Sequence, residues 1–196
     1  MGQLNISAVS YINSIPFVYG IKESGLLNDY DLSLDVPSVC AEKLKSNQVD
    51  IGLIPTAMIP EIRGGKIITN YCIGATGPVK SVILASNTSL EKIKKIYLDN
   101  ESRSSVKLTK ILAENYWNIS PEWEAANISR IEKIYDEDAA VLIGDKVFLY
   151  ENNFKHIYDL AEEWQKFTSL PFVFACWVSN KELPAELVMT FNNAME

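Results

Sequence analysis

Apolar and polar residues follow one another along the chain in short blocks, and the spacing within a block changes between that of a strand and that of a helix. Residues 31–36 (DLSLDV) alternate with a period of two, which predicts a half-buried strand. Residues 139–144 (AAVLIG) and 171–178 (PFVFACWV) are short apolar runs typical of buried strands. From Ser104 onward, apolar residues recur on one face at helical spacing. The pattern therefore predicts an α/β protein with mostly parallel sheets covered by helices.

Proline and capping residues indicate where further elements begin. A serine before an apolar helical run is a typical N-cap, and proline favours a first helical turn because its φ angle is already helical. On these signals we expect additional strands and helices at the following places: strands at 4–9, 50–54, 79–86 and 96–99, and helices opening near Pro16, Ser38 and Ser89 and covering 159–167.

The chain contains no flexible linker, internal repeat or low-complexity segment. Two lobes without a linker imply that chain segments pass directly from one to the other, and the segments 74–80 and 176–181 are the candidate hinges. We therefore expect one lobe to contain residues 1–77 and 180–196, and the other to contain residues 78–179.

Length, composition and charge narrow the class of protein. The chain has 196 residues, of which 47% are hydrophobic and 22% charged, as in an ordinary globular protein. Its net charge of −7 argues against generic binding to nucleic acid or anionic membranes. No apolar run reaches the roughly 18 residues that cross a bilayer, and the N-terminus does not resemble a secretory signal. Cys40, Cys72 and Cys176 fit buried thiols in a reducing compartment, so we expect a cytoplasmic location.

Metal, nucleotide and hydrolase chemistry lack their usual residues. His156 is the single histidine and no Cys-x-x-Cys pair occurs, so no zinc site is predicted. Glycine-rich nucleotide motifs and a Gly-x-Ser-x-Gly elbow are also absent from the sequence. We expect His156 to be a surface residue because it lies in the polar stretch FKHIYD, and we expect neither a metal nor a cofactor.

Polar segments interrupt the apolar pattern at strand ends, where open α/β sheets bind ligands. In the segment 10–16, Asn13 offers both a donor and an acceptor, although turn and capping chemistry is an alternative role. Ser81 places a hydroxyl inside an otherwise β-branched strand and would face either a ligand or solvent. Gly144 allows close approach to the backbone, and Asp145 either caps the next helix or stands at the ligand.

A fourth polar segment, Asp99-Asn100-Glu101-Ser102-Arg103-Ser104-Ser105, opens the long amphipathic helix. Exposed amides at a helix N-terminus attract anions, and an arginine can bind a carboxylate through two hydrogen bonds. The serines and arginine are more numerous than capping requires. This segment therefore predicts a binding site for a small carboxylate.

These segments, taken in order, resemble one family, the chorismate dehydratases of the futalosine route to menaquinone. The resemblance runs over essentially the whole chain and is carried by SYINSIPF, VDIGLIP, GPVKSVIL, LDNESRSSVKL, VLIGD, and YDLAEEW followed by TSLPFVFACW. It implies the two-lobed fold of type II periplasmic solute-binding proteins, with mixed sheets flanked by helices and a hinge between the lobes. It also implies conversion of chorismate, a dicarboxylate, to 3-[(1-carboxyvinyl)oxy]benzoate and water without a cofactor.

The resemblance implies roles for the matching residues. Asn13 matches an asparagine implicated in the dehydration, and Ser81 matches a serine that contacts substrate. Ser104 and Ser105 match a Ser/Thr pair expected to bind a carboxylate, and residues 143–145 match the family's Ile-Gly-Asp. The expected catalytic residues are Asn13 and Asp145, and the expected substrate-binding residues are Ser10, Tyr11, Ser81, Arg103, Ser104, Ser105 and Gly144.

Two departures from the family pattern are visible. Thr168-Ser169 stands where the family usually has Thr-Gly, which alters a turn but no expected catalytic group. Family members also usually continue for several tens of residues, with helices that return to the first lobe, so we expect the first lobe to lack those helices here.

Several alternatives stay open on the sequence. The base in the dehydration is either Asp145 or the substrate's own side-chain carboxylate. A carboxylate-binding protein of the same fold without catalysis is one other function. A 1,4-dihydroxy-6-naphthoate synthase is another, and it would be expected to use a histidine near its cleft. The sequence also leaves open whether the chain forms a homodimer.

Overall fold

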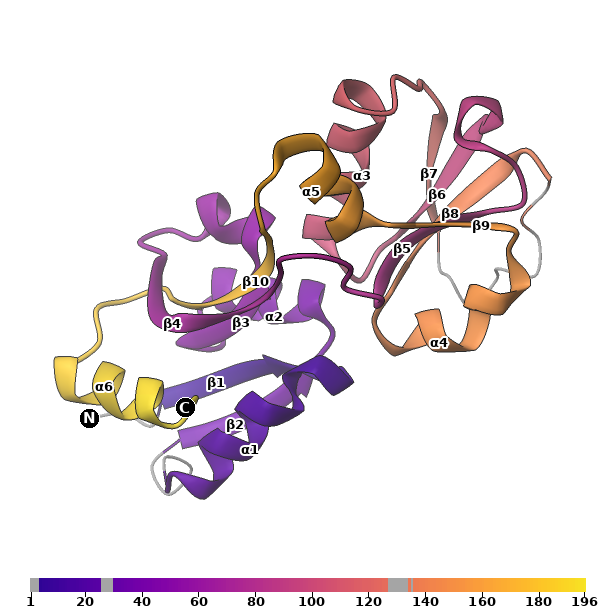
Figure 1. Cartoon of the computed structure of the whole chain (residues 1–196). Coiled ribbons are helices and arrows are strands. Elements are labelled where there is room, and N and C mark those ends of the chain that lie inside the picture. Colours follow the sequence, from indigo (N-terminus) through magenta and orange to yellow (C-terminus); the bar gives the residue numbers. More distant parts are fainter. Residues whose placement is uncertain (1–3, 26–29, 127–133, 135) are drawn as a thin grey trace. The chain divides into compact units, whose positions relative to one another are not determined.

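The computed structural model describes residues 4–25, 30–126, 134 and 136–196. The chain divides into two compact units, which are shown in Figure 1. Unit 1 consists of Met1–Ile73 and Val173–Glu196, and unit 2 is the continuous stretch Gly74–Phe172. The chain therefore leaves unit 1, completes unit 2 and then returns to unit 1.

Unit 1 is built on a five-stranded sheet with the order β2-β1-β3-β10-β4. Its strands are β1 (Leu4–Val9), β2 (Tyr30–Asp35), β3 (Ile51–Pro55), β4 (Lys66–Ala75) and β10 (Phe172–Ser179). β1 pairs in parallel with β2 and β3, whereas β10 runs antiparallel to β3. β3 is buried along its whole length, as expected for a central strand with an apolar sequence.

Helices pack on this sheet and complete the core of unit 1. They are α1 (Ile15–Glu23), α2 (Pro37–Lys45) and α6 (Ala185–Asn193), with the short 3-10 helices η1 (Ile12–Ser14) and η3 (Thr56–Glu61). The Trp177 ring on β10 is fully buried and makes edge contacts with Phe17 at 6.2 Å and Phe191 at 5.1 Å between ring centroids. α2 begins one residue before the expected cap Ser38, because Pro37 takes the first helical position and Val36 is the N-cap.

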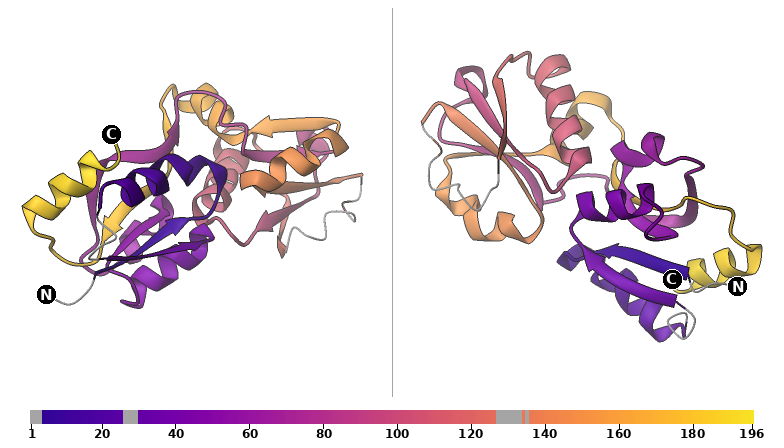
Figure 2. Two further views of the ribbon diagram at one scale, coloured as in Figure 1. Left: turned by 90° about the horizontal axis from the view of Figure 1, so that it is seen from below. Right: turned by 180° about the vertical axis from the view of Figure 1, so that it is seen from behind.

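The end of α6 packs closely against α1, as the views in Figure 2 show. A methyl group added at Gly20 would lie only 1.7 Å from the carbonyl oxygen of Ala194. Phe191 and Met195 on either side of this contact are buried in the core. The missing side chain of Gly20 is therefore what allows the last helix to reach the first.

Unit 2 has its own five-stranded sheet, with the order β7-β6-β8-β5-β9. Its strands are β5 (Val82–Ser86), β6 (Lys95–Asp99), β7 (Glu122–Ala126), β8 (Asp138–Ile143) and β9 (His156–Asp159). β6 is parallel to β7 and β8, and β5 is antiparallel to β8 and β9. β5 and β8 are completely buried and form the centre of this core.

The helices of unit 2 follow the strand ends. They are α3 (Arg103–Asn115), α4 (Val147–Tyr150) and α5 (Leu160–Thr168), with the 3-10 helices η4 (Leu90–Lys92), η6 (Gly144–Lys146) and η7 (Glu151–Asn153). The expected opening of a short helix near Ser89 corresponds to η4, for which Ser89 is the N-cap residue.

Both sheets are mixed, whereas the hydrophobic pattern alone predicts mostly parallel ones. β5 and β10 are the strands that run antiparallel to their neighbours. Each is the first strand after the chain passes from one unit to the other. It is therefore not joined to the strand beside it by a crossover helix, the connection that parallel neighbours usually have. The mixed sheets that the family resemblance implies are therefore confirmed.

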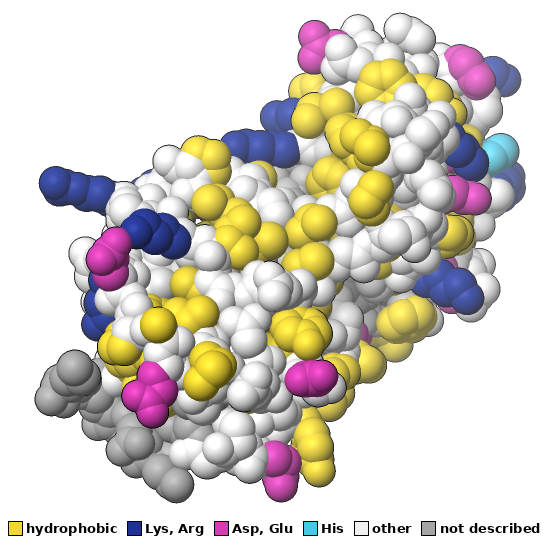
Figure 3. Space-filling model, turned by 60° about the vertical axis from the view of Figure 1, so that its left-hand side comes forward, with side chains coloured by type: hydrophobic (Ala, Val, Ile, Leu, Met, Phe, Trp, Pro, Cys, Tyr) yellow, Lys and Arg dark blue, Asp and Glu magenta, His cyan; other side chains and the backbone are white. Residues whose placement is uncertain are grey.

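The exposure of side chains corrects the expectation that all three cysteines are buried, and it bears on the expectation that His156 lies at the surface. Cys40 and Cys176 are buried, but Cys72 is exposed, because alternate residues of the edge strand β4 face solvent. His156 is half-buried on β9, and Figure 3 shows its ring in cyan at the surface. Among the described residues, no helix is both long enough and apolar enough to cross a membrane.

Candidate functional site

One group of expected site residues lies at a single edge of the unit 1 sheet. β1 and β3 are parallel, so their carboxyl ends lie at the same edge. Ser10, Tyr11 and Asn13 follow β1 directly, and Thr56 follows β3. The backbone N–H of Ser10 donates to the carbonyl of Asp35 at 2.9 Å, which holds the ends of β1 and β2 together. The structure thus brings Ser10, Tyr11 and Asn13 to one polar edge.

Asn13 presents its amide at the surface of this edge. It lies in η1 and is exposed, and its Oδ1 accepts a hydrogen bond of 3.3 Å from Ser14 Oγ. The bond is long and joins neighbouring residues, so the fold depends little on the Asn13 side chain. An exposed amide carries both donors and acceptors for a polar ligand.

Thr56 is a polar residue of the same edge that the sequence interpretation missed. Its Oγ1 donates to the carbonyl of Val173 at 2.8 Å, which ties the end of β3 to the start of β10. The signal was present, because a hydroxyl directly follows the buried run DIGLIP. The same rule that singled out Ser10 after β1 would have found it.

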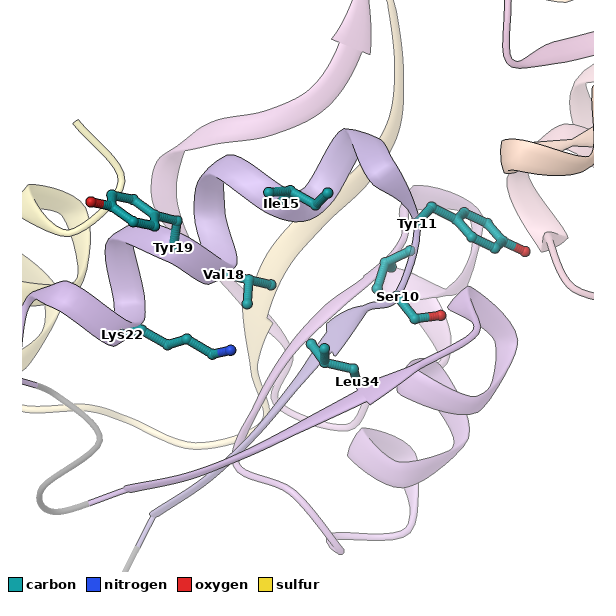
Figure 4. Close-up of a pocket in the computed structure, with 8 residues that line it drawn as sticks. Ser10, Tyr11, Ile15, Val18, Tyr19, Lys22 and Leu34 are labelled. Carbon is teal, nitrogen blue, oxygen red and sulfur yellow. The ribbon is translucent and has the colours of Figure 1, made fainter. Parts of the chain in front are cut away.

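A groove of about 290 Å³ lies beside this edge on unit 1, and Figure 4 shows its lining. Ser10 and Tyr11 line it near the end of β1, and Lys22 of α1 also lines it. Its other lining residues are apolar or aromatic: Val9, Ile15, Val18, Tyr19 and Leu34. This lining suits an apolar or aromatic group better than a pair of carboxylates.

A charged network supports the end of β2. Asp35 Oδ2 accepts hydrogen bonds from Ser7 and Ser33, both at 2.8 Å, and from Lys43 Nζ at 2.6 Å. Burial by itself raises the pKa of Asp35, but these bonds and the charge of Lys43 outweigh burial and hold the pKa below its usual range. The carboxylate joins β1, β2 and α2, and we assign it to the fold.

The second group of expected residues lies at one edge of the unit 2 sheet. β6 and β8 are parallel, and β5 is antiparallel to β8, so the ends of β6 and β8 and the start of β5 share an edge. The backbone N–H of Gly144 donates to the carbonyl of Ser81 at 2.8 Å. Ser81, Gly144 and Asp145 are therefore neighbours on this edge, beside the β6–α3 turn.

Ser81 lies just before β5, which begins at Val82, and not inside a strand as expected. Lys80 has a φ of 61°, a left-handed conformation that interrupts the extended chain. Its backbone N–H donates to Asp159 Oδ2 at 2.6 Å, and Asp159 Oδ1 also accepts from the first turn of α5. The Lys80 turn is thus held by the cap of α5, and it sets the position of Ser81.

The serines at the start of α3 are largely engaged with one another. The helix begins at Arg103, and Ser102 is its N-cap, with Oγ accepting from Ser105 N–H at 3.3 Å and lying 2.9 Å from Ser105 Oγ. Ser104 and Ser105 are buried, whereas Arg103 is exposed. Part of this hydroxyl cluster therefore builds the helix terminus, and Arg103 is its accessible charged group.

Asp145 is half-buried in η6 and does not cap α4, whose N-cap residue is Lys146. Lys146 itself reaches back to the β6–α3 turn, with Nζ 2.6 Å from Glu101 Oε1 and 3.6 Å from Asp99 Oδ2. Burial raises the pKa of the Asp99 carboxyl above its usual range, and Glu101 N–H and Lys146 only partly offset this. The sequence interpretation missed Lys146, and it named Asp99 only as part of the polar segment 99–105, without a role of its own.

Comparison with known proteins indicates the family. A family model described as menaquinone biosynthesis matches residues 4–196. A chorismate dehydratase of Campylobacter jejuni is 27% identical over 190 residues, covering 93% of this chain and 71% of that protein. A chorismate dehydratase of Thermus thermophilus is 25% identical over 167 residues, covering 76% of this chain and 61% of that protein.

Solved structures with the same fold have lower sequence identity. The protein AF1704 of Archaeoglobus fulgidus has a TM-score of 0.72 at 15% identity, covering 98% of this chain and 73% of its own. The methionine-binding protein MetQ has a TM-score of 0.58 at 10% identity, covering 98% and 89%. An ancestral arginine-binding protein bound to glutamine has a TM-score of 0.53 at 15% identity, covering 100% and 91%. These structures show a fold of the type II periplasmic-binding-protein kind.

Proposed function

The chain belongs to the menaquinone biosynthesis family, and on that premise we propose that it is a chorismate dehydratase of the futalosine route. It would convert chorismate to 3-[(1-carboxyvinyl)oxy]benzoate and water, in the cytoplasm and without a cofactor. The observation that carries the proposal is the family match over residues 4–196, together with two curated relatives that are both named chorismate dehydratase.

The reaction asks for positioning more than for strong acids and bases. Chorismate loses its ring hydroxyl and a proton from the neighbouring ring carbon, and the six-membered ring becomes aromatic. The two losses balance as one water molecule, with no oxidant or reductant. Because aromatisation drives the reaction, the protein has to orient the carboxylates, assist departure of the hydroxyl and provide an acceptor for the proton.

The two polar edges offer residues for these tasks. In our proposal, Asn13 of unit 1 hydrogen-bonds the departing hydroxyl, and an exposed amide at a strand end suits that role. Arg103, Ser104 and Ser105 at the α3 N-terminus bind a carboxylate, with Ser81 as a further polar contact. Ser10, Tyr11 and Gly144 complete the set. The proton acceptor is either Asp145 or the substrate's own side-chain carboxylate.

Two other functions are less well supported. Solved neighbours of the same fold include a methionine-binding protein and an arginine-binding protein, so a binding function without catalysis is the first alternative. The second, 1,4-dihydroxy-6-naphthoate synthase, would be expected to use a histidine near its site. His156 pairs with Ser86 at the far end of β5, opposite the edge that carries Ser81, so its position in unit 2 does not favour this reading.

The test is to incubate the purified protein with chorismate and to follow products by chromatography. We expect 3-[(1-carboxyvinyl)oxy]benzoate to form, and we expect Asn13→Ala to abolish its formation while the melting temperature stays unchanged, because Asn13 is exposed. Asn193→Ala, which changes another exposed asparagine of unit 1, is the matched control. Binding of chorismate without any aromatic product would favour the binding protein, and full activity of Asn13→Ala would remove Asn13 from the mechanism.

A further inference from the structure

One ammonium group joins the two turns of unit 2 that carry expected site residues. Lys146 ends η6, directly after Gly144 and Asp145, and its Nζ lies 2.6 Å from Glu101 Oε1. Glu101 lies in the β6–α3 turn, directly before the N-cap of α3. The ammonium of Lys146 is therefore held at the sheet edge, beside the helix terminus that is the expected anion site.

Asp99 is a second carboxylate near this ammonium, and one of its two buried oxygens lacks a hydrogen bond within the part of the chain that the structure describes. It is 2% exposed, and its Oδ1 accepts a hydrogen bond of 2.9 Å from the N–H of Glu101. Its Oδ2 is buried and has no hydrogen-bond partner among the described residues. The nearest cation is Lys146 Nζ at 3.6 Å, too far for a hydrogen bond. A buried carboxylate oxygen without a donor opposes folding, so its presence calls for another explanation.

We propose that Lys146 binds a carboxylate group of the ligand, and that Asp99 is the positioning residue that keeps the Lys146 ammonium at the edge of the unit 2 sheet. The ligand class, a small dicarboxylate, rests on the proposed function. Lys146 lies outside the residues that the sequence indicates, and Asp99 has no expected role there beyond its place in the polar segment 99–105.

The distances explain how the pair would work. An ammonium has three N–H donors, and Glu101 at 2.6 Å accepts one of them. Asp99 attracts the ammonium by charge at 3.6 Å without taking a donor in a hydrogen bond. A lysine side chain is flexible and strongly hydrated, so the buried charge of Asp99 adds to the ion pair with Glu101 in restricting where Nζ lies. Lys146 is partly exposed, with 29% of its side chain accessible, which allows contact with a ligand.

The experiment compares Lys146→Gln and Asp99→Asn with the unmodified protein. Calorimetric titration measures the Kd for chorismate and for 3-[(1-carboxyvinyl)oxy]benzoate, and a turnover assay measures KM and kcat. We expect Lys146→Gln to raise the Kd roughly tenfold to hundredfold, the effect of losing a charged hydrogen bond. Asp99→Asn keeps the bond from Glu101 N–H, so we expect a smaller rise in Kd and KM with an unchanged or higher melting temperature.

Lys94→Gln is the matched control. Lys94 precedes β6, at the opposite end from Asp99, and its Nζ forms an ion pair of 2.6 Å with Glu137. Removing that pair also deletes one positive charge from unit 2 and should leave the Kd unchanged. A Kd that rises equally in Lys94→Gln and Lys146→Gln would reflect net charge alone and would overturn the proposal.

The outcomes separate this inference from the proposed function. Turnover by the unmodified protein with an unchanged Kd in Lys146→Gln would overturn the role of Lys146 and leave the dehydratase proposal standing. Binding without turnover, weakened in Lys146→Gln and Asp99→Asn, would support the inference and contradict the dehydratase. A lower melting temperature in Asp99→Asn with unchanged Kd and KM would make Asp99 purely structural. Failure of the unmodified protein to bind either compound would overturn both proposals.

Discussion

At the scale of single residues, two aspartates at strand ends show how differently the fold treats the same group. Asp35 ends β2 and accepts three side-chain hydrogen bonds through its Oδ2 atom, so its charge is stabilised and its pKa lies low. Asp99 ends β6 with an Oδ2 atom that lacks any such bond among the described residues, and its pKa lies high. Asp35 contributes to folding as an anion, whereas Asp99 costs stability in that form.

This contrast gives Asp99 a defined effect on the pH dependence of stability. Burial raises its folded-state pKa above the value in the unfolded chain. The stability that it contributes is therefore fully present below the unfolded pKa and is lost as the pH rises through the folded pKa. Urea unfolding of the unmodified protein and of Asp99→Asn should show the variant gaining relative stability as the pH is raised from about 4, where an aspartate of the unfolded chain ionises. A difference in unfolding free energy that stays constant as the pH is raised would contradict the prediction.

The residues of the candidate site were only partly predictable from the sequence. Asn13, Ser81, Gly144 and Asp145 stand out because polar groups directly follow or precede apolar runs. Lys146 did not stand out, because its partners Glu101 and Asp99 are more than forty positions away and meet it only through the parallel pairing of β6 and β8. Which charges lie together is decided by strand order, and no local pattern contains that order.

At the scale of elements, burial decided which strands could be recognised. The strands β3, β5 and β8 are buried at every position, and their continuous apolar runs predicted them. The edge strands β4, β7 and β9 went unrecognised, because many of their residues face solvent and carry polar side chains, whereas the edge strand β2 was predicted from its regular alternation. The amphipathic α3 was predicted with its start one residue late, since the serine cluster offers several capping residues.

The contact between α1 and α6 depends on one residue and can be tested directly. In Gly20→Ala the new methyl group would overlap the carbonyl oxygen of Ala194, so the two helices would have to separate. We expect the free energy of unfolding, measured in urea, to fall by about 2 kcal/mol or more. Glu23→Ala, an exposed change in the same helix, should have little effect. An unchanged stability in Gly20→Ala would show that α6 does not pack there.

At the scale of the whole molecule, the two units differ in how they use the chain. Unit 2 is continuous, from Gly74 to Phe172, and has its own sheet and core. Unit 1 is discontinuous, because its strand β10 and helix α6 come from the end of the chain. Because the sequence has no linker, we expected chain segments to pass directly from one lobe to the other. The two-lobed fold itself was implied by the family resemblance.

Because unit 2 is continuous in sequence and unit 1 is not, we expect fragments of the two units to behave differently. A fragment of residues 74–172 should fold by itself and show a cooperative thermal transition by circular dichroism, since all strands of its sheet are present. A fragment of residues 1–73 should show no such transition, because β4 joins the sheet only through β10. Cooperative unfolding of residues 1–73 alone would contradict this reasoning.

The central position of β10 also has a consequence for synthesis on the ribosome. β3 and β4 are made early, but the strand that belongs between them is translated only after the whole of unit 2. Until β10 is made, the edges of β3 and β4 that it will join stay unpaired. All of unit 2 is synthesised during this time. The usual order, in which N-terminal structure is finished first, is thus reversed here. Chaperones that shield exposed strands should act on this protein during translation, and its yield should depend on them more than the yield of unit 2 alone.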